Sequence, residues 1–240
     1  MGNERFVFCI IKKRKINIEY FKLYLQMILF LIQMKYIIIQ ETSEIRLIID
    51  GGGGEQNILN NGFDNNPSEV WVNDSLYTSY SKTCDLPTGL SEVTLKFDDQ
   101  LESCSEMFKD LNNLKEVNLS DFDASKVASM KSMFYGCSNL EKITFGNINT
   151  SSVTDLGQFL QGCSRLSSID LINLDTSKVT NFAWMFFSCH NLESINFGSI
   201  DTSNVESTWC MFYECQNLKS VDLSNLKLSK LNYMQTMFDG

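Results

Sequence analysis

Four cysteines in the second half of the chain recur at a constant interval of 26 residues. They are Cys137, Cys163, Cys189 and Cys215. Neither zinc sites nor small disulfide scaffolds space their cysteines in this way. A constant interval indicates an internal repeat, and a repeat constrains the fold more strongly than any other feature of the chain.

When the chain is aligned on these cysteines, it divides without gaps into 26-residue copies. The copy at 174–199 reads LDTSKVTNFAWMFFSCHNLESINFGS, and a partial copy at 226–240 ends the chain. The full copies are 96–121, 122–147, 148–173, 174–199 and 200–225. One copy has apolar faces and nothing of its own to cover them. Neighbouring copies are therefore expected to stack and to bury each other's side chains.

Each copy combines two apolar periods. Val179, Phe182, Met185 and Cys189 have the three- and four-residue spacing of one helix face, and the DTS motif ahead of them has side chains that cap helices. The following stretch ESINF, at 193–197, alternates like a short strand. One strand and one short helix per copy predict an α/β fold, a leucine-rich-repeat-like solenoid whose strands form a parallel sheet.

Cys189 is followed by His190, the chain's only histidine, and such a pair can be a nucleophile with its base or part of a metal site. The cysteine recurs in four copies, whereas serine or glutamine replaces the histidine in the others. A catalytic pair would be confined to one copy and would need a third group to orient the base. We therefore interpret the cysteines as a buried ladder, and we predict no enzyme activity and no catalytic, cofactor-binding or metal-binding residue.

The elements DTS.V, MF and C..L, in register, resemble the repeat of the BspA-like leucine-rich-repeat surface proteins of bacteria and protists. The resemblance covers about residues 96–240. Phe159-Leu160 in place of MF and Lys227-Leu228 in place of DT depart from the pattern in ways that packing tolerates. The resemblance implies display on the cell surface and a role in adhesion or host interaction. It implies no catalytic residue.

Residues 44–95 lie outside the copies. The stretches EIRLIID, EVWVND and SEVTLKF alternate or are rich in β-branched residues, which predicts a small β-rich cap on the first copy. The glycine run 51–54 lacks the Lys-Ser/Thr that follows a phosphate loop, so we interpret it as a flexible turn. A disulfide between Cys84 and Cys104 stays an alternative to free thiols in this region.

Residues 1–43 place the basic run KKRK at 12–15 ahead of an apolar stretch, as a signal anchor does. The longest clean apolar run, Met27 to Ile32, is too short to span a membrane. A mis-assigned start, with Met34 as the first residue, is the alternative. The last copy stops one residue before its ladder cysteine, so we expect a fragment of a longer protein or a truncated product. Membrane association through residues 1–43 or through a missing C-terminal region stays open.

Function on such a scaffold is expected on the strand positions that face outward. These candidate binding residues are Lys115, Asn118, Lys142, Thr144, Ser168, Asp170, Ser194, Asn196, Ser220 and Asp222. They mix charges without a basic stripe and the chain has a net charge of −9, which argues against nucleic acid as a partner. A second surface has aromatic side chains, which we expect to be half-buried between the helices: Tyr135, Trp184, Phe187, Trp209 and Tyr213.

These observations lead to two hypotheses of function. The first is a non-enzymatic binding or adhesion module of a surface-displayed protein, cell-surface or extracellular, which contacts an unidentified protein or glycan through the strand face. Three Asn-X-Ser glycosylation motifs, at Asn73, Asn118 and Asn149, fit this location. The second is a cytoplasmic leucine-rich-repeat scaffold for protein–protein interaction, which uses the same surface.

Overall fold

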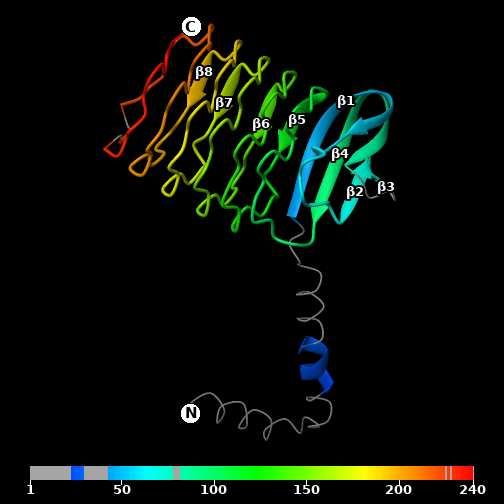
Figure 1. Cartoon of the computed structure of the whole chain (residues 1–240). Helices are drawn as coiled ribbons and strands as arrows, with labels where there is room; N and C mark the ends of the chain where they lie inside the picture. The colour runs from blue at the N-terminus through cyan, green and yellow to red at the C-terminus, as the bar shows by residue number, and fades with distance from the viewer. Residues whose placement is uncertain (1–22, 30–42, 78–81, 225, 228, 240) are drawn as a thin grey trace, which may run out of the picture. The chain divides into compact units, whose positions relative to one another are not determined.

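A computed structural model describes residues 23–29, 43–77, 82–224, 226–227 and 229–239 (Figure 1). The chain divides into two compact units, Met1–Glu41 and Thr42–Gly240. In the first unit residues 23–29 are helical, and the basic run of the predicted signal anchor and most of its apolar stretch lie outside the described residues. Within the described part of the chain, no helix has the length and apolarity that a membrane span requires.

The second unit begins with two long antiparallel strands, β1 (Ser43–Asn57) and β4 (Thr83–Phe97). Two short strands, β2 (Glu69–Val72) and β3 (Ser75–Tyr77), extend the sheet beyond β4. On the other side β1 pairs antiparallel with β5 (Leu114–Asn118), which pairs parallel with β6 (Lys142–Thr144). The resulting sheet has six strands in the order β3-β2-β4-β1-β5-β6, and the parallel pair β7 (Ser168–Asp170) and β8 (Ser194–Asn196) forms a second sheet.

Alternation of apolar and polar residues explains the long strands. In β1, Ile45, Leu47 and Ile49 are fully buried, whereas the residues between them are partly exposed. The three stretches that predict strands in residues 44–95 lie in β1, β2 and β4.

The glycine run 51–54 is not a turn, as the sequence suggested, because it continues β1 opposite β4. Gly51 pairs with Gly89 and Gly54 with Leu86. A Cβ atom on Gly51 would lie 2.3 Å from the carbonyl oxygen of Pro87, and Gly54 has a φ of 89°, which favours glycine. Close strand contact and backbone conformation therefore account for glycine at these two positions.

Beyond β4, each 26-residue copy lies beside the next one in chain order, from β5 towards the C-terminal end in Figure 1. Parallel bridges join residues that occupy the same place in successive copies. The bridged residues are Ser103, Ser129, Asp155, Asn181, Ser207 and Tyr233. One apolar core runs through all the copies and continues under β1 and β4.

The predicted α/β solenoid with one helix per copy is wrong, because residues 43–239, as far as the structure describes them, contain strands and turns but no helix. In the copy 174–199, alternate amides donate to carbonyls of the following copy. Trp184 N–H donates to Trp209 (2.8 Å) and Phe186 N–H to Met211 (3.0 Å). The amide of Met185, between them, closes a turn with the carbonyl of Phe182, three residues back.

This arrangement is incompatible with an α-helix, in which each interior amide bonds to the carbonyl four residues earlier. Trp184 and Ser188 also have left-handed φ angles of 56° and 55°, which a right-handed helix cannot contain. The three-residue apolar spacing arises because both ends of each turn are buried, as at Phe182 and Met185. Tight turns in series therefore imitate the periodicity of a helix face.

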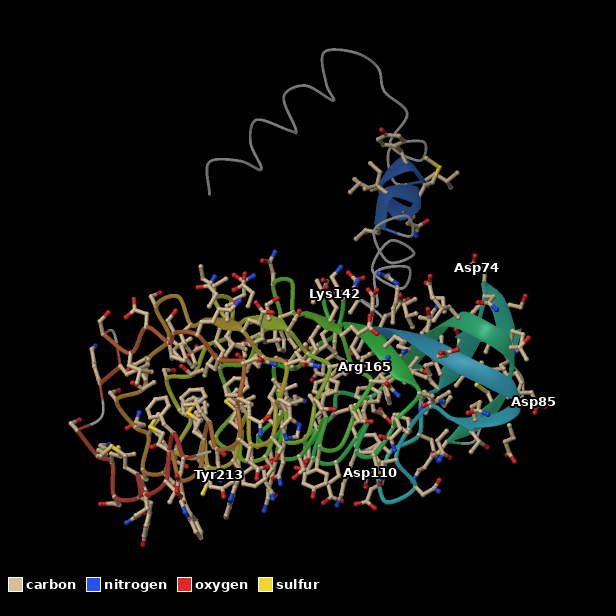
Figure 2. The ribbon with its side chains drawn as sticks, turned by 90° about the horizontal axis from the view of Figure 1, so that it is seen from above. Asp74, Asp85, Asp110, Lys142, Arg165 and Tyr213 are labelled. Carbon is tan, nitrogen blue, oxygen red and sulfur yellow. The ribbon has the colours of Figure 1, made fainter. Side chains whose placement is uncertain are left out.

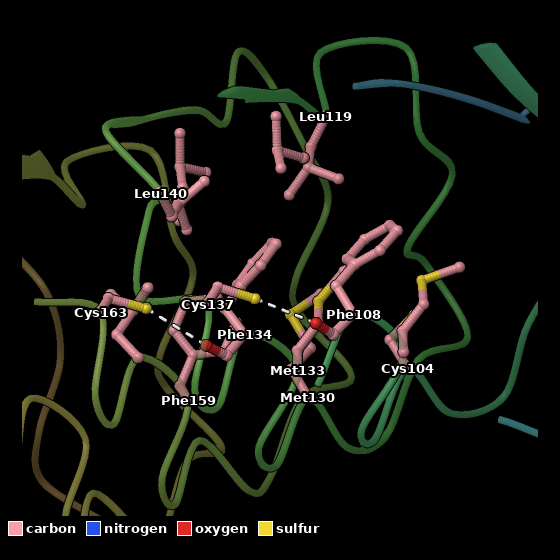
Figure 3. Close-up of a cluster of buried hydrophobic side chains, with 14 of the residues drawn as sticks. Cys104, Phe108, Leu119, Met130, Met133, Phe134, Cys137, Leu140, Phe159 and Cys163 are labelled. Atoms are coloured by element: carbon pink, nitrogen blue, oxygen red, sulfur yellow. Dashed lines mark hydrogen bonds between the residues drawn. The ribbon is translucent and has the colours of Figure 1, made fainter. Parts of the chain in front are cut away.

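Phenylalanine rings follow one another through the core. Phe108 stacks on Phe134 at 5.5 Å between ring centroids, and Phe186 stacks on Phe212 at 5.6 Å. Where Phe159-Leu160 interrupts the pattern, Phe159 meets Phe134 edge-on at 5.3 Å, and both residues of the interrupted pair are fully buried. Figure 3 shows Phe108, Phe134 and Phe159 among the buried cysteines and methionines of the neighbouring copies. Packing therefore tolerates this departure from the pattern.

The threonine of the DTS motif, which reads NTS at 149–151, connects neighbouring copies instead of capping a helix. Thr150, Thr176 and Thr202 are buried. The hydroxyl of Thr176 donates to the backbone carbonyl of Asp201 in the next copy at 2.7 Å. In the same way the hydroxyl of Thr150 donates to the backbone carbonyl of Asp175 at 3.1 Å. Each such bond satisfies a polar group at the boundary between two copies.

Replacing Thr176 with valine is expected to lower the free energy of unfolding by about 1–3 kcal/mol, because the Asp201 carbonyl loses its hydroxyl donor while the side-chain volume is kept. Urea denaturation followed by circular dichroism measures this loss. The matched control is Thr180→Val in the same copy, since the Thr180 side chain is exposed and its hydroxyl makes a longer bond of 3.3 Å. Equal unfolding free energies for the two variants would contradict the assigned role of Thr176.

Candidate binding face

The outward positions of the six-stranded sheet form rows across the strands. In one row Thr94, Arg46, Asn118 and Thr144 are successive partners on β4, β1, β5 and β6. In the next row the partners are Glu92, Ile48, Glu116 and Lys142. Figure 2 shows Lys142 on the side of the strands, whereas Asp110 and Tyr213 lie on the opposite side, among the turns.

A hollow of about 200 Å³ lies between these two rows. Three of the predicted binding residues, Asn118, Lys142 and Thr144, line it. The other lining residues are Arg46, Ile48, Glu92, Glu116 and Val117. The prediction missed Arg46, Ile48 and Glu92, although the alternation in EIRLIID and SEVTLKF already placed them on the outer face. The missing information was the antiparallel pairing of β1 with β5.

Two cations and two carboxylates surround the hollow. Arg46 Nη2 lies 2.8 Å from Asp121 Oδ2 and 3.2 Å from Glu44 Oε2, so its guanidinium is held in place. Lys142 Nζ lies 3.9 Å from Glu116 Oε2, at the limit of an ion pair. Within the described residues, the carboxylate of Glu92 has no ion-pair partner. The hollow is therefore polar, and the formal charges of the four charged residues that line it cancel. Within the part of the chain that the structure describes, only some of these charged groups have an ion-pair partner.

The other predicted binding residues lie away from the hollow. The Lys115 side chain is mostly buried, with its Nζ atom 3.6 Å from Glu141 Oε1. Ser168 pairs with Ser194 and Asp170 with Asn196, on β7 and β8. Ser220 and Asp222 are exposed in a segment without strand structure. The structure thus brings three of the ten together at one concave site and spreads the remaining seven along the copies.

Four of the ten have a structural role that explains why asparagine or aspartate recurs there. The side-chain oxygen of each accepts the amide of the residue two positions later, which closes a turn; for all but Asp222 this turn follows a strand. The pairs are Asn118 with Ser120 (2.9 Å), Asp170 with Ile172 (3.1 Å), Asn196 with Gly198 (3.1 Å) and Asp222 with Ser224 (2.9 Å). Recurrence at these positions therefore reports turn geometry and is not evidence for a ligand.

The aspartates of the DTS motif close turns of the same kind. Asp175 Oδ1 accepts the Ser177 amide and Asp201 Oδ1 the Ser203 amide, both at 3.0 Å. Hydrogen bonds from the hydroxyl and then the amide of Ser177 lower the pKa of Asp175 below its ordinary value of 3.8. The amide and then the hydroxyl of Ser203 lower the pKa of Asp201. Both carboxylates are therefore stabilised in their charged form by the fold.

These lowered pKa values predict a loss of stability in acid. A folded-state pKa below the unfolded value gives a stabilisation that is complete above the unfolded pKa, near 3.9, and is lost as the pH falls through the folded pKa. The double variant Asp175→Asn, Asp201→Asn keeps an oxygen acceptor but has no charge to titrate. Its unfolding free energy, measured in urea between pH 7 and about pH 2.5, is expected to fall less steeply with acid than that of the natural chain. If the unfolding free energies of the two proteins depended on pH in the same way, the stabilising role of the Asp175 and Asp201 carboxylates would be refuted.

The cysteine and histidine at 189–190 have different partners in the structure. The Cys189 thiol is buried and donates to the carbonyl of Leu160 at 3.1 Å. His190 Nε2 lies 3.9 Å from Glu214 Oε2, and its side chain is 45% exposed. Figure 3 shows the equivalent bonds in earlier copies, from Cys137 to Phe108 and from Cys163 to Phe134. The cysteine side chain therefore serves the contact between copies.

The described cysteines are all free and buried, so Cys84 and Cys104 form no disulfide in this structure. Burial raises the pKa of Cys84 and Cys215 to about 11 and that of Cys104 to about 12. It also raises the pKa of Cys163 and Cys189 well above the ordinary value. The described residues contain no cluster of histidine, cysteine and acidic side chains that could hold a metal ion.

Native thiols in the ladder are expected to react slowly with iodoacetamide at pH 8, because only the exposed thiolate is nucleophilic. Peptide mass mapping of the folded chain should show little alkylation of Cys163 and Cys189, and full alkylation after urea unfolding. Ser220→Cys supplies an exposed reference thiol, which should react in the native state. Alkylation of Cys163 as fast as that of the reference thiol would contradict the buried ladder.

The second surface has its aromatic side chains on turns, not between helices as expected. Tyr135, Trp184, Phe187 and Tyr213 are half-buried, and Trp209 is 43% exposed. Phe187 stacks on Tyr213 at 5.0 Å and Trp184 lies 4.6 Å from Trp209 between ring centroids. The rings of adjacent copies thus cover one another, which is a packing role.

Comparisons with known proteins place the copies in a family. The model of a family described as Mycoplasma protein of unknown function, DUF285, matches residues 102–194 and 142–240, which together span more than half of the chain. Neither curated proteins nor solved structures gave a match. The family is related to the BspA-like surface proteins, so the predicted resemblance holds at that level, without support for a leucine-rich repeat. The chain belongs to the DUF285 family of Mycoplasma-type proteins of unknown function.

Proposed function

We propose that this protein is a non-enzymatic binding module of a BspA-like surface protein, and that it contacts a ligand outside the cell through the outer face of its six-stranded sheet. The observation that carries the proposal is the hollow between β1, β4, β5 and β6, where charged and polar groups surround the aliphatic side chain of Ile48. A concave site with a few convergent polar groups is the usual form of a ligand site.

The rigidity of the sheet supports this function. Arg46 is held by two carboxylates and Asn118 by the Ser120 amide, so these side chains need little ordering when a ligand arrives. Preorganised groups bind more tightly because less conformational entropy is lost. The relation of the family to the BspA-like surface proteins supports the surface location. The buried, hydrogen-bonded thiol of Cys189 supports a binding rather than a catalytic role.

A second candidate, an intracellular protein–protein scaffold, is favoured by one observation. The described cysteines are free, and free thiols are typical of reducing compartments such as the cytoplasm. The same sheet face would then bind a cytoplasmic partner. The two candidates differ in location and can therefore be separated by experiment.

The test expresses the complete reading frame with a C-terminal tag in its native host and labels intact cells with a membrane-impermeant biotin reagent. The surface function requires that the tagged chain is biotinylated while a cytoplasmic marker is not, and glycosidase treatment shows whether Asn73, Asn118 or Asn149 carries a glycan. A tag that is labelled only after lysis would reject the surface function and leave the scaffold.

A further inference from the structure

We propose that the hollow on the sheet binds a neutral glycan, with one sugar ring over Ile48. This inference deepens the proposed function and rests on it for its biological setting. The hollow has four charged groups, Arg46, Lys142, Glu92 and Glu116, whose formal charges cancel. Arg46 is already paired with Asp121 and Glu44, and Lys142 lies near Glu116, so a strongly anionic ligand, such as a phosphorylated chain, would find each of these cations occupied by a carboxylate.

The polar groups match the needs of sugar hydroxyls, each of which both donates and accepts hydrogen bonds. Carboxylates such as those of Glu92 and Glu116 accept such bonds, and hydrogen bonds to charged groups are the stronger ones. The guanidinium of Arg46, the amide of Asn118 and the hydroxyl of Thr144 supply donors on the opposite side. Donors lie along the row of Arg46, whereas the row of Ile48 combines two carboxylate acceptors with the donor Lys142. Groups of both kinds therefore surround a ring that presents hydroxyls at its edge.

The floor of the hollow suits the apolar face of a sugar ring. Ile48 is half-buried and lies between Glu92 and Glu116, its partners on β4 and β5. Ile48 is the one apolar residue of the row formed by Glu92, Ile48, Glu116 and Lys142. A pyranose ring can place its carbon-bound hydrogens against such an aliphatic side chain. Covering Ile48 removes apolar area from water, which adds affinity that bare polar contacts do not provide.

The same face extends the site beyond one sugar. Trp71 on β2 is in the row of Arg46, separated from it by Thr94 on β4, and two strand spacings place it roughly 10 Å away. Its indole Nε1–H donates to Glu69 at 2.8 Å, and Lys96 Nζ lies 5.1 Å from its ring centroid. A glycan of several units that fills the hollow and crosses the strands reaches this ring.

The experiment applies the purified 1–240 chain to an array of immobilised neutral, acidic and basic oligosaccharides and then titrates the tightest neutral binder by calorimetry. The variants Glu92→Gln and Glu116→Gln keep the side-chain shape and remove the charged acceptor. Each is expected to raise the dissociation constant about tenfold or more. The matched control is Glu193→Gln, an exposed glutamate outside the hollow, which is expected to change it less than about twofold. Circular dichroism of each variant checks its fold.

The inference is overturned if the array retains only acidic or only basic glycans, if no glycan is retained, or if Glu193→Gln weakens binding as much as the two hollow variants do. Failure of the proposed function has a different signature, since it is read from surface biotinylation of cells. Suppose that the chain is exposed on the surface, does not bind neutral glycans and binds a cell-surface protein, and that Glu92→Gln abolishes this binding. This result would support the proposed function and reject the glycan as the ligand.

Discussion

The rest of this structure depends on one interaction, the hydrogen bonds between neighbouring copies. In these bonds alternate amides of one copy donate to carbonyls of the next. They fix the interval, because Trp184 can meet Trp209 and Phe186 can meet Met211 only when the copies stay in register. They also exclude the α-helix, because an amide committed to the neighbouring copy cannot bond within its own segment. The buried phenylalanines and cysteines then follow as columns, since the backbone brings equivalent side chains together.

Turn closure accounts for most of the recurring polar residues. Aspartate or asparagine at the ends of the short strands and in the DTS motif binds an amide two residues later, and the DTS threonine binds the next copy. Residues with such roles recur whether or not the protein binds anything. A search for function is therefore better directed at polar residues that the backbone does not need, and Glu92, Glu116, Lys142 and Thr144 around the hollow are of this kind.

The sequence was sufficient for the 26-residue interval and for several outward strand positions, because both are local patterns, but Lys115 is mostly buried and Ser220 and Asp222 lie in no strand. It was misleading about helices, since the three- and four-residue spacing of Phe182, Met185 and Cys189 is common to a helix face and to successive tight turns. The left-handed conformation of Trp184 and Ser188 and the hydrogen bonds between copies distinguish the two. The sequence was insufficient to predict the hollow, because strand pairing there brings together Arg46 and Asn118, which are far apart in sequence. Long-range strand pairing has no local signature, so the site could be predicted only in part.

The position of the hollow has a consequence for how such a protein acquires specificity. Copies that obey one pattern repeat the buried and turn-closing side chains, so a site built from copies alone can vary only at its few outward positions. The hollow combines Asn118, Lys142 and Thr144 of the first copies with Arg46, Ile48 and Glu92 of the non-repeating strands. Copies added or removed farther along the chain leave these six residues in place. In the proposed function the non-repeating strands therefore determine the ligand, whereas the number of copies determines how large a supporting surface accompanies the site.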